Sequence, residues 1–195
     1  MEDISFFAIA MNGIFVKNFL LVQFLGLCSF LGVSKETKSA AGMSAAVMFV
    51  MIMSALTAFL IYTYILEPFG LTFLTTISFI ILIAALVQLV EFIIRKYSPP
   101  LYRSLGIYLP LISTNCAVLG VVILNVRLEY DFVHSLFYGF TAALGYTMVM
   151  LLMSAIREKT NVLNVPASIK GIPHAFFIAT LLSMAFVNFF GVIPT

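Results

Sequence analysis

Long apolar runs separated by short polar stretches make up most of this chain. Each run is long enough to cross a hydrocarbon core of about 30 Å as a helix, at about 1.5 Å per residue. The pattern predicts six transmembrane helices, near residues 4–33, 40–66, 71–94, 101–126, 133–156 and 172–192. Composition agrees, since 63% of residues are hydrophobic, 9% are charged and the mean hydropathy is +1.15. We therefore expect one all-α integral membrane domain over 1–195, with no soluble module.

Charged residues gather in the predicted connections and indicate an orientation. Eight of the ten basic residues fall in or beside connections on one side, namely Lys35, Lys38, Arg95, Lys96, Arg103, Arg157, Lys159 and Lys170. The other side carries Glu2, Asp3, Glu67, Arg127, Glu129 and Asp131. The positive-inside rule then places both termini outside the cytoplasm. The acidic start and the length of the first run argue against a cleaved signal peptide, and a net charge of +2 gives no basis for nucleic-acid binding.

The only two cysteines lie in matching hexapeptides, each reading Cys-x-x-Leu-Gly-Val. These are Cys28–Val33 and Cys116–Val121. Two weaker matches follow in the same order, 42–46 with 139–143 and 85–88 with 185–188. Together they predict a 3+3 duplication with repeats at about 4–96 and 101–192. Because each repeat has an odd number of spans, the two would lie inverted in the membrane, with the functional site near the midplane between them.

Helix-breaking residues precede both cysteines. The first run is long for one crossing and contains Asn12-Gly13 and Gly26, while the fourth contains Pro110 and the polar run Ser113-Thr114-Asn115. Proline removes a backbone donor, and nearby polar side chains can satisfy the groups that a break releases. We predict that helices one and four are broken, with each cysteine at or just after its break.

The residues alone leave several roles open for the cysteines. They suit two small buried apolar side chains, a disulfide, or two of the four thiolates of an iron-sulfur cluster. Lys17, within the first run, either pairs locally or assists an anionic cluster or an ion path. Glu91 precedes Arg95 by four residues, so a local ion pair is the default. We find no nucleophile with a base and no nucleotide-binding glycine motif, so we expect no self-contained catalytic site.

Three longer motifs carry a family resemblance over nearly the whole chain. Phe24–Lys35, Pro99–Val121 and Ala155–Lys159 resemble motifs of the A-type membrane subunits of Rnf complexes, the ion-translocating ferredoxin:NAD+ oxidoreductases. The related E subunit of sodium-pumping NADH:quinone reductase shares these motifs and is the alternative. A secondary transporter or a substrate-binding membrane protein would also suit six spans, but leaves the duplicated hexapeptide unexplained.

The resemblance implies a shared cofactor. Cys28 and Cys116 would ligate the iron of a [2Fe-2S] cluster, and a homologous, oppositely oriented E-type subunit would supply two further cysteines. Flavins and other iron-sulfur clusters would lie on other subunits, and the complex would also contain subunits of the B, C, D and G types. The complex would lie in the cytoplasmic (inner) membrane of a bacterium or archaeon and couple electron transfer to movement of Na+ or H+.

Overall fold

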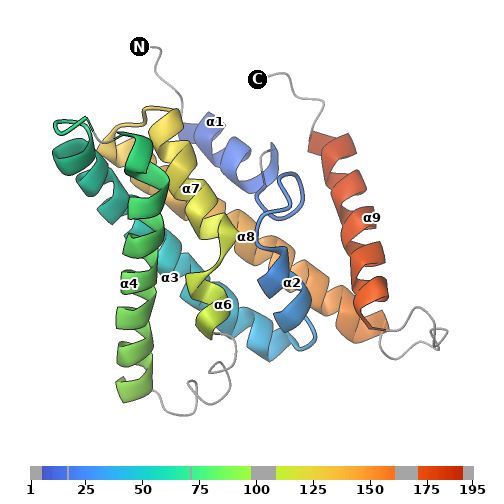
Figure 1. The fold of residues 1–195 in the computed structure, drawn as a ribbon. Helices are drawn as coiled ribbons and strands as arrows, with labels where there is room; N and C mark the ends of the chain where they lie inside the picture. Colours follow the sequence, from blue (N-terminus) through green and yellow to red (C-terminus); the bar gives the residue numbers. More distant parts are fainter. Residues whose placement is uncertain (1–5, 17, 71, 98–108, 161–170, 191–195) are drawn as a thin grey trace.

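The computed structural model describes residues 6–16, 18–70, 72–97, 109–160 and 171–190, and all regular structure in these ranges is helical. The elements, shown in Figure 1, are α1 (Phe6–Met11), the π-helix η1 (Asn12–Val16), α2 (Leu27–Val33), α3 (Thr37–Ile61), the π-helix η2 (Tyr62–Leu66), the 3-10 turn η3 (Thr72–Leu74), α4 (Thr75–Tyr97), α6 (Leu109–Ser113), α7 (Cys116–Arg127), α8 (Phe132–Thr160) and α9 (Ile172–Phe190). The all-helical class is confirmed.

Three helices are long and apolar enough to cross a membrane: Thr37–Leu66, Thr75–Ile93 and Phe132–Thr160. Leu111–Arg127 and Ile172–Val187 are shorter apolar helices. The helices occupy the places along the chain that the hydrophobic pattern predicted. The six-span inverted repeat stays a prediction, because helix length and composition support crossing for only three of the described helices.

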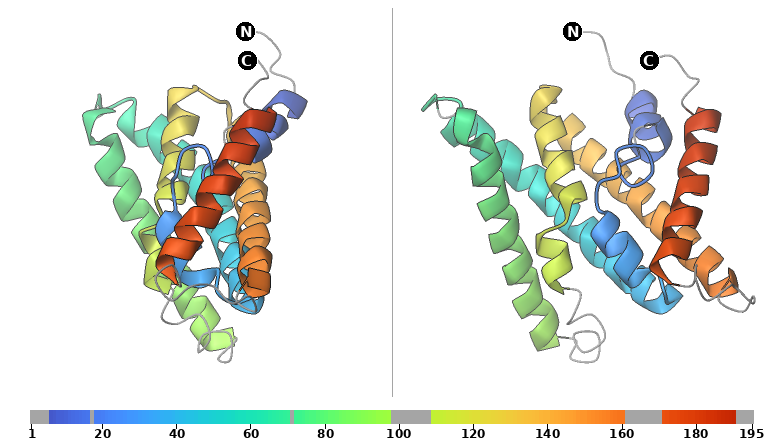
Figure 2. Two further views of the ribbon diagram at one scale, coloured as in Figure 1. Left: turned by 90° about the vertical axis from the view of Figure 1, so that its right-hand side faces the viewer. Right: turned by 45° about the vertical axis from the view of Figure 1, so that its right-hand side comes forward.

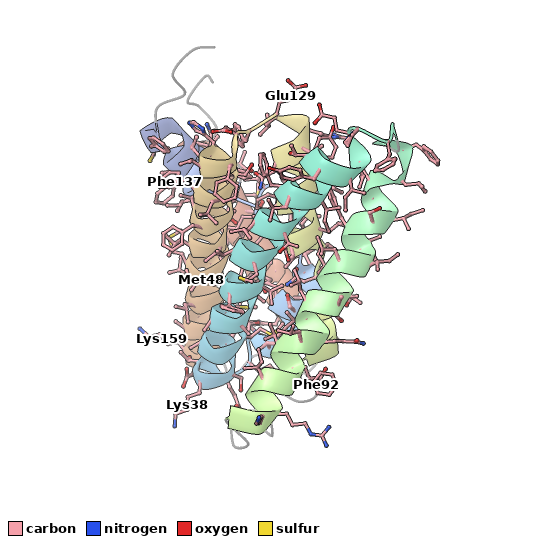
Figure 3. The ribbon with its side chains drawn as sticks, turned by 90° about the vertical axis from the view of Figure 1, so that its left-hand side faces the viewer. Lys38, Met48, Phe92, Glu129, Phe137 and Lys159 are labelled. Carbon is pink, nitrogen blue, oxygen red and sulfur yellow. The ribbon has the colours of Figure 1, made fainter. Side chains whose placement is uncertain are left out.

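The centre of the fold is the pair of α3 and α8, which lie side by side along much of their length (Figure 3). The two helices approach closely at Gly139, where an added methyl group would lie only 2.9 Å from the Ala55 side chain. A small residue at this position lets the two helices approach closely. At the far end, the Thr37 hydroxyl donates to Glu158 and accepts from Ser154 at 3.3 Å. Thr37 and Glu158 lie beyond the predicted spans: α3 starts at 37 where the prediction was 40, and α8 ends at 160 where the prediction was 156.

The outer helices α4 and α9 lie on opposite edges of the bundle (Figures 1 and 2). Many apolar side chains of α4 and of the turn before it are exposed, among them Phe73, Ile81 and Phe92. An exposed apolar helix face is costly in water and normal in lipid. The arrangement therefore suits a helix that faces the bilayer or a neighbouring membrane protein.

Charges separate to the two ends of the bundle. Lys38 and Lys159 lie at one end and Glu129 at the other (Figure 3), and α1 begins and α9 ends at the Glu129 end (Figure 1). This agrees with the charge sorting that the sequence indicated, while the side that faces the cytoplasm stays a prediction. Arg103 and Lys170 lie outside the described residues.

Both predicted helix breaks are present. In the first segment, helix ends at Val16 and resumes at Leu27; in the fourth, it ends at Ser113 and resumes at Cys116. Cys28 is the second residue of α2 and Cys116 is the first of α7. We call residues 18–33 the Cys28 arm and residues 109–121 the Cys116 arm.

Candidate functional site

The Cys28 arm begins with a compact irregular turn that is held by backbone bonds. The carbonyl of Asn18 accepts from the amide of Val22 at 3.0 Å, and the carbonyl of Phe19 accepts from that of Leu25 at 2.8 Å. Phe24 and Gly26 adopt positive φ angles of 53° and 85°. The left-handed conformation is costly for residues with a Cβ, so glycine is favoured at the position from which α2 starts.

The Cys116 arm has a much shorter break. The Asn115 side chain is the N-cap of α7, because its Oδ1 accepts from the amide of Ala117 at 3.0 Å. Asparagine is among the preferred N-cap residues, since its side chain satisfies an amide that the first turn leaves free. The Cys116 thiol lies 3.9 Å from the carbonyl of Thr114. Cys116 is thus placed at the helix N-terminus by the residue that precedes it.

The two arms touch at their helix starts. A methyl group on Gly26 would lie 3.0 Å from Asn115 Oδ1 and 3.3 Å from the Ala117 methyl. Asn115 Nδ2 also donates to Ser29 Oγ at 3.4 Å. Since Ser29 follows Cys28 and Asn115 precedes Cys116, these contacts bring the two cysteine-bearing turns together.

The glycines of the two hexapeptides pack crosswise. A methyl group on Gly120 would meet the Phe19 ring at 3.1 Å, and one on Gly32 would meet Leu111 at 4.0 Å. Each glycine therefore faces a residue that precedes the other cysteine. The close approach is at Gly120, whereas the contact at Gly32 is an ordinary van der Waals distance.

Both thiols are free and exposed in this chain. The structure therefore does not support the interpretation of Cys28 and Cys116 as buried apolar side chains, nor a disulfide between them. Among the described residues, no group of three or more His, Cys, Asp or Glu side chains is placed to hold a metal ion. Within that part of the chain, the donor set at this site is two thiols on adjoining turns.

Two residues of α8 hold the Cys28 arm. Tyr146 is buried, and its hydroxyl lies 2.8 Å from Ser29 Oγ, which also donates to the carbonyl of Gly26 at 2.9 Å. Arg157 is only 6% exposed and donates to the carbonyl of Leu31 at 2.9 Å and to Ser34 Oγ at 2.7 Å. One residue binds the start of α2 and the other binds its end.

The placement of Arg157 corrects the sequence analysis. Its charge suggested a connection at the end of helix five, but Arg157 lies in the last turn of α8 and is buried. A guanidinium has five donors and suits the free carbonyls at a helix C-terminus. Its position in the motif Ala155–Lys159 was a usable signal, whereas Tyr146 had none.

The remaining candidates add little to this site. Lys17 lies outside the described residues, so its role stays a prediction. Glu91 and Arg95 lie on α4, away from α2, with Arg95 in the last turn of that helix. Their predicted ion pair also stays a prediction.

Comparison with known proteins agrees with the three motifs. Residues 6–193 match the family described as "Rnf-Nqr subunit, membrane protein". The chain is 63% identical over 191 residues to the A subunit of the ion-translocating oxidoreductase complex of Methanosarcina acetivorans, covering 97% of this chain and 96% of that protein. It is 53% identical over 180 residues to the protein of the same name from Serratia proteamaculans, covering 92% and 93%.

A third relative has a more specific name. The A subunit of the Na(+)-translocating ferredoxin:NAD(+) oxidoreductase complex of Acetobacterium woodii is 50% identical over 183 residues, covering 94% of this chain and 95% of that protein. The resemblance carried by the cysteine motifs and by Ala155–Lys159 is confirmed. With its full-length match, its apolar helices and its joined cysteine turns, this chain belongs to the Rnf-Nqr family of membrane subunits.

Proposed function

We propose that this chain is the A-type membrane subunit of an ion-translocating ferredoxin:NAD+ oxidoreductase complex. In this function Cys28 and Cys116 are two ligands of a [2Fe-2S] cluster that is shared with a second membrane subunit. The observation that carries the proposal is the pair of free, exposed thiols on turns joined by Asn115 and Ser29. Relatives named as the A subunits of such complexes support the choice of complex.

The donor set fits half of the cluster. A [2Fe-2S] cluster takes four thiolates in its common form, and this chain has two cysteines. Exposed thiols leave room for a partner to approach and supply the other two. When bound, the cluster would pass single electrons through the membrane part of the complex.

The chain itself supplies position and shape. Asn115 fixes the start of α7 beside Cys116, and Ser29 with Tyr146 fixes the start of α2 beside Cys28. The close approach of Gly120 to the Phe19 ring then packs one arm against the other. A cluster shared between two subunits requires that each subunit hold its two ligands in fixed positions, because both pairs must match the geometry of the same cluster.

The partner in this proposal is a homologous subunit in inverted orientation, as the resemblance to Rnf subunits implies. Two cysteines contributed in the same way by a related chain would complete the four ligands about a pseudo-twofold axis. Translocation of Na+ or H+ would then accompany electron transfer through the assembled membrane part, with both termini of this chain on the outer side. The chain would be part of an enzyme without a catalytic site of its own.

Electron paramagnetic resonance of the purified complex tests the proposal. We expect Cys28→Ser and Cys116→Ser each to abolish the signal of the membrane cluster and ferredoxin-dependent NAD+ reduction. The signals of clusters on other subunits and the subunit composition on a native gel serve as assembly controls. Survival of the membrane-cluster signal in both assembled variants would overturn the ligand assignment.

A further inference from the structure

Three buried polar side chains meet between the two cysteine-bearing arms. Ser29 comes from α2, Asn115 is the residue before α7, and Tyr146 lies in the middle of α8. Each of the three is at most 2% exposed. Polar groups buried in a membrane protein are costly unless they are bonded to one another, and they commonly accompany functional sites. The bonds among these three side chains therefore carry information about the cysteine site.

The direction of each bond in this network follows from its chemical groups. The carbonyl of Gly26 can only accept, so the Ser29 hydroxyl donates its single hydrogen to that carbonyl at 2.9 Å. Asn115 Nδ2 can only donate, and it lies 3.4 Å from Ser29 Oγ. The Tyr146 hydroxyl, which lies 2.8 Å from the same oxygen, must therefore donate as well. Ser29 Oγ thus uses its hydrogen and both of its lone pairs.

The Ser29 hydroxyl is a junction that stands directly beside both cysteines in the chain. Ser29 follows Cys28, and Asn115 precedes Cys116. Their bond therefore joins the two turns within one residue of each cysteine, a step of about 3.8 Å between Cα atoms. Asn115 Oδ1 accepts from the amide of Ala117 at the same time, so the Asn115 side chain is held at both ends. The thiols are exposed, whereas the junction between their turns is buried.

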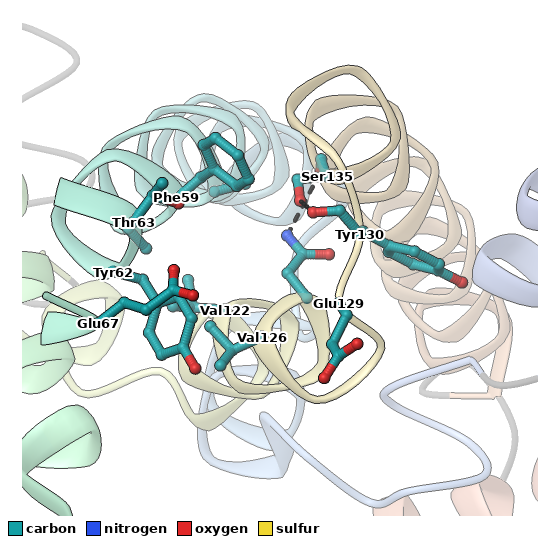
Figure 4. Close-up of a pocket in the computed structure, with 12 residues that line it drawn as sticks. Phe59, Tyr62, Thr63, Glu67, Val122, Val126, Glu129, Tyr130 and Ser135 are labelled. Atoms are coloured by element: carbon teal, nitrogen blue, oxygen red, sulfur yellow. Dashed lines mark hydrogen bonds between the residues drawn. The ribbon is translucent and has the colours of Figure 1, made fainter. Parts of the chain in front are cut away.

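A second buried asparagine, Asn125, lies near the other end of α7 and offers a comparison. It is 6% exposed and lines a cavity of about 330 Å³ at the Glu129 end of the bundle, as do Tyr62 and Ser135 (Figure 4). Its Nδ2 donates to the carbonyl of Ser135 at 3.3 Å, and its Oδ1 has no hydrogen-bond partner among the described residues. Asn125 is about 15 Å along the helix from Asn115, so it serves as a control for the loss of a buried amide.

We propose that Ser29 is a positioning residue of the cysteine pair: its hydroxyl fixes the separation of the two sulfurs and raises the reduction potential of the cluster that they hold. The potential rests on the proposed function, whereas the separation is a property of this chain. Asn115 and Tyr146 both donate to Ser29, so the positive ends of two bond dipoles point toward the residue next to Cys28. Such dipoles favour an added electron, because cluster potentials depend on the hydrogen bonds and charges around the ligands.

Nitroxide labels on the two thiols test the separation in the full chain purified alone. Cys28 and Cys116 are the only cysteines of the sequence and both are exposed, so a thiol-specific label reports on these two positions. Dipolar broadening of the EPR spectrum should show a wider spread of distances in Ser29→Ala than in the native chain. Asn115→Ser should give the same change, because serine keeps an N-cap oxygen but removes the Nδ2 donor. Asn125→Ala should leave the spectrum unchanged.

Redox titration of the purified complex, followed by the EPR signal of the membrane cluster, tests the potential. In Ser29→Ala the midpoint should become more negative, so the ratio of reduced to oxidised cluster at the native midpoint should fall several-fold. Tyr146→Phe removes one of the two donors and keeps the ring, so its shift should have the same direction and be smaller. Ser29→Thr keeps the hydroxyl, so its midpoint should lie closer to the native value. Asn125→Ala should leave the midpoint unchanged.

The two measurements separate this proposal from the cluster assignment. Native label spectra in both Ser29→Ala and Asn115→Ser would show that the junction does not fix the sulfurs, and would overturn the proposal. An unchanged midpoint in Ser29→Ala, or an equal shift in Asn125→Ala, would also overturn it. If Cys28→Ser and Cys116→Ser both keep the membrane-cluster signal, the cluster assignment fails instead, and the label spectra of the chain still decide whether Ser29 fixes the sulfurs.

Discussion

The helix that carries Cys116 is capped by its own sequence, whereas the helix that carries Cys28 has no side-chain cap and takes bonds from a distant helix. Asn115 caps α7 from the residue next to Cys116. The start of α2 has no side-chain cap within the described part of the chain, and Gly26 stands at that position. Two residues of α8 bind this helix: Tyr146 bonds to Ser29 near its start and Arg157 bonds to Leu31 near its end. The same hexapeptide is thus built into the molecule in two different ways.

This difference indicates which cysteine the rest of the chain controls. Changes along α8 reach both ends of α2 through hydrogen bonds, while α7 starts from a local cap. A movement of α8 would therefore be transmitted to the Cys28 arm through these bonds. In a cluster shared between two subunits, the Cys28 arm is the one that can couple cluster geometry to the surrounding helices.

The largest expected effect comes from Gly26→Val, which breaks the contact between the arms. A β-branched residue at a φ of 85° is strained, and its side chain would overlap Asn115 Oδ1 at 3.0 Å. The combined cost is about 3 kcal/mol or more. We expect loss of the chain from the purified complex and loss of the membrane-cluster signal.

Gly70→Val is the matched control for that change. Gly70 also has a positive φ, 66°, but no atom of the described residues lies within 4 Å of an added Cβ. It carries the backbone strain without the overlap, so the complex should assemble with a smaller fall in its thermal inactivation midpoint. Equal losses in both variants would show that Gly26 matters for strain alone and not for the joint between the arms.

Arg157→Gln is expected to weaken the Cys28 arm alone, as the second-largest effect. It removes charged donors from the half-buried carbonyl of Leu31 and from the buried hydroxyl of Ser34, which costs about 1.5–3 kcal/mol. The thermal inactivation midpoint of the complex measures it, and Arg157→Lys should recover part of the loss. Lys159→Gln, an exposed change in the same helical turn, should have little effect. A comparable loss in Lys159→Gln would contradict the role of Arg157.

Arg157 also shows where sequence reasoning reaches its limit. The helical class, the helix positions, both breaks and the cysteines beside them follow from hydrophobic length and from residues such as Asn115, whose effect is local. Arg157 and Tyr146 act across more than 110 positions of the chain. No local pattern encodes such a contact, and a basic residue after a long apolar run reads as part of a connection. The exposure of both thiols could not be predicted either, because it depends on how the two arms pack.

Asn115→Ala tests the local side of the comparison and should have a smaller effect. Loss of the N-cap costs about 1 kcal/mol, and the bond to Ser29 is lost with it. Asn115→Asp keeps the acceptor for the Ala117 amide but removes the Nδ2 donor. The thermal inactivation midpoint of the Asp variant should lie between those of the Ala variant and the native chain. If Asp is as damaging as Ala, the bond between the arms outweighs the cap, and the Cys116 arm is less self-sufficient than its structure indicates.

The smallest expected effect is that of Tyr146→Phe, which removes one hydroxyl from the Cys28 arm. Polar bonds between membrane helices average about 0.6 kcal/mol in double-mutant cycles. A cycle with Ser29→Ala should return a coupling of this size in the free energy of unfolding, because the two hydroxyls lie 2.8 Å apart. The same cycle with Thr180→Ala, on the exposed face of α9, should return none, since distant sites are additive.

If Tyr146 and Ser29 show a measurable coupling energy while the Cys116 arm is unaffected, Tyr146 is a positioning residue of the Cys28 arm alone. If the coupling between Tyr146 and Ser29 is zero, the Tyr146 hydroxyl does not stabilise the arm. Among the described bonds from α8 to this arm, those of Arg157 would then be the ones that affect stability. The position of Cys28 would then depend on the bonds of Arg157 at the end of α2, about one and a half turns from the thiol.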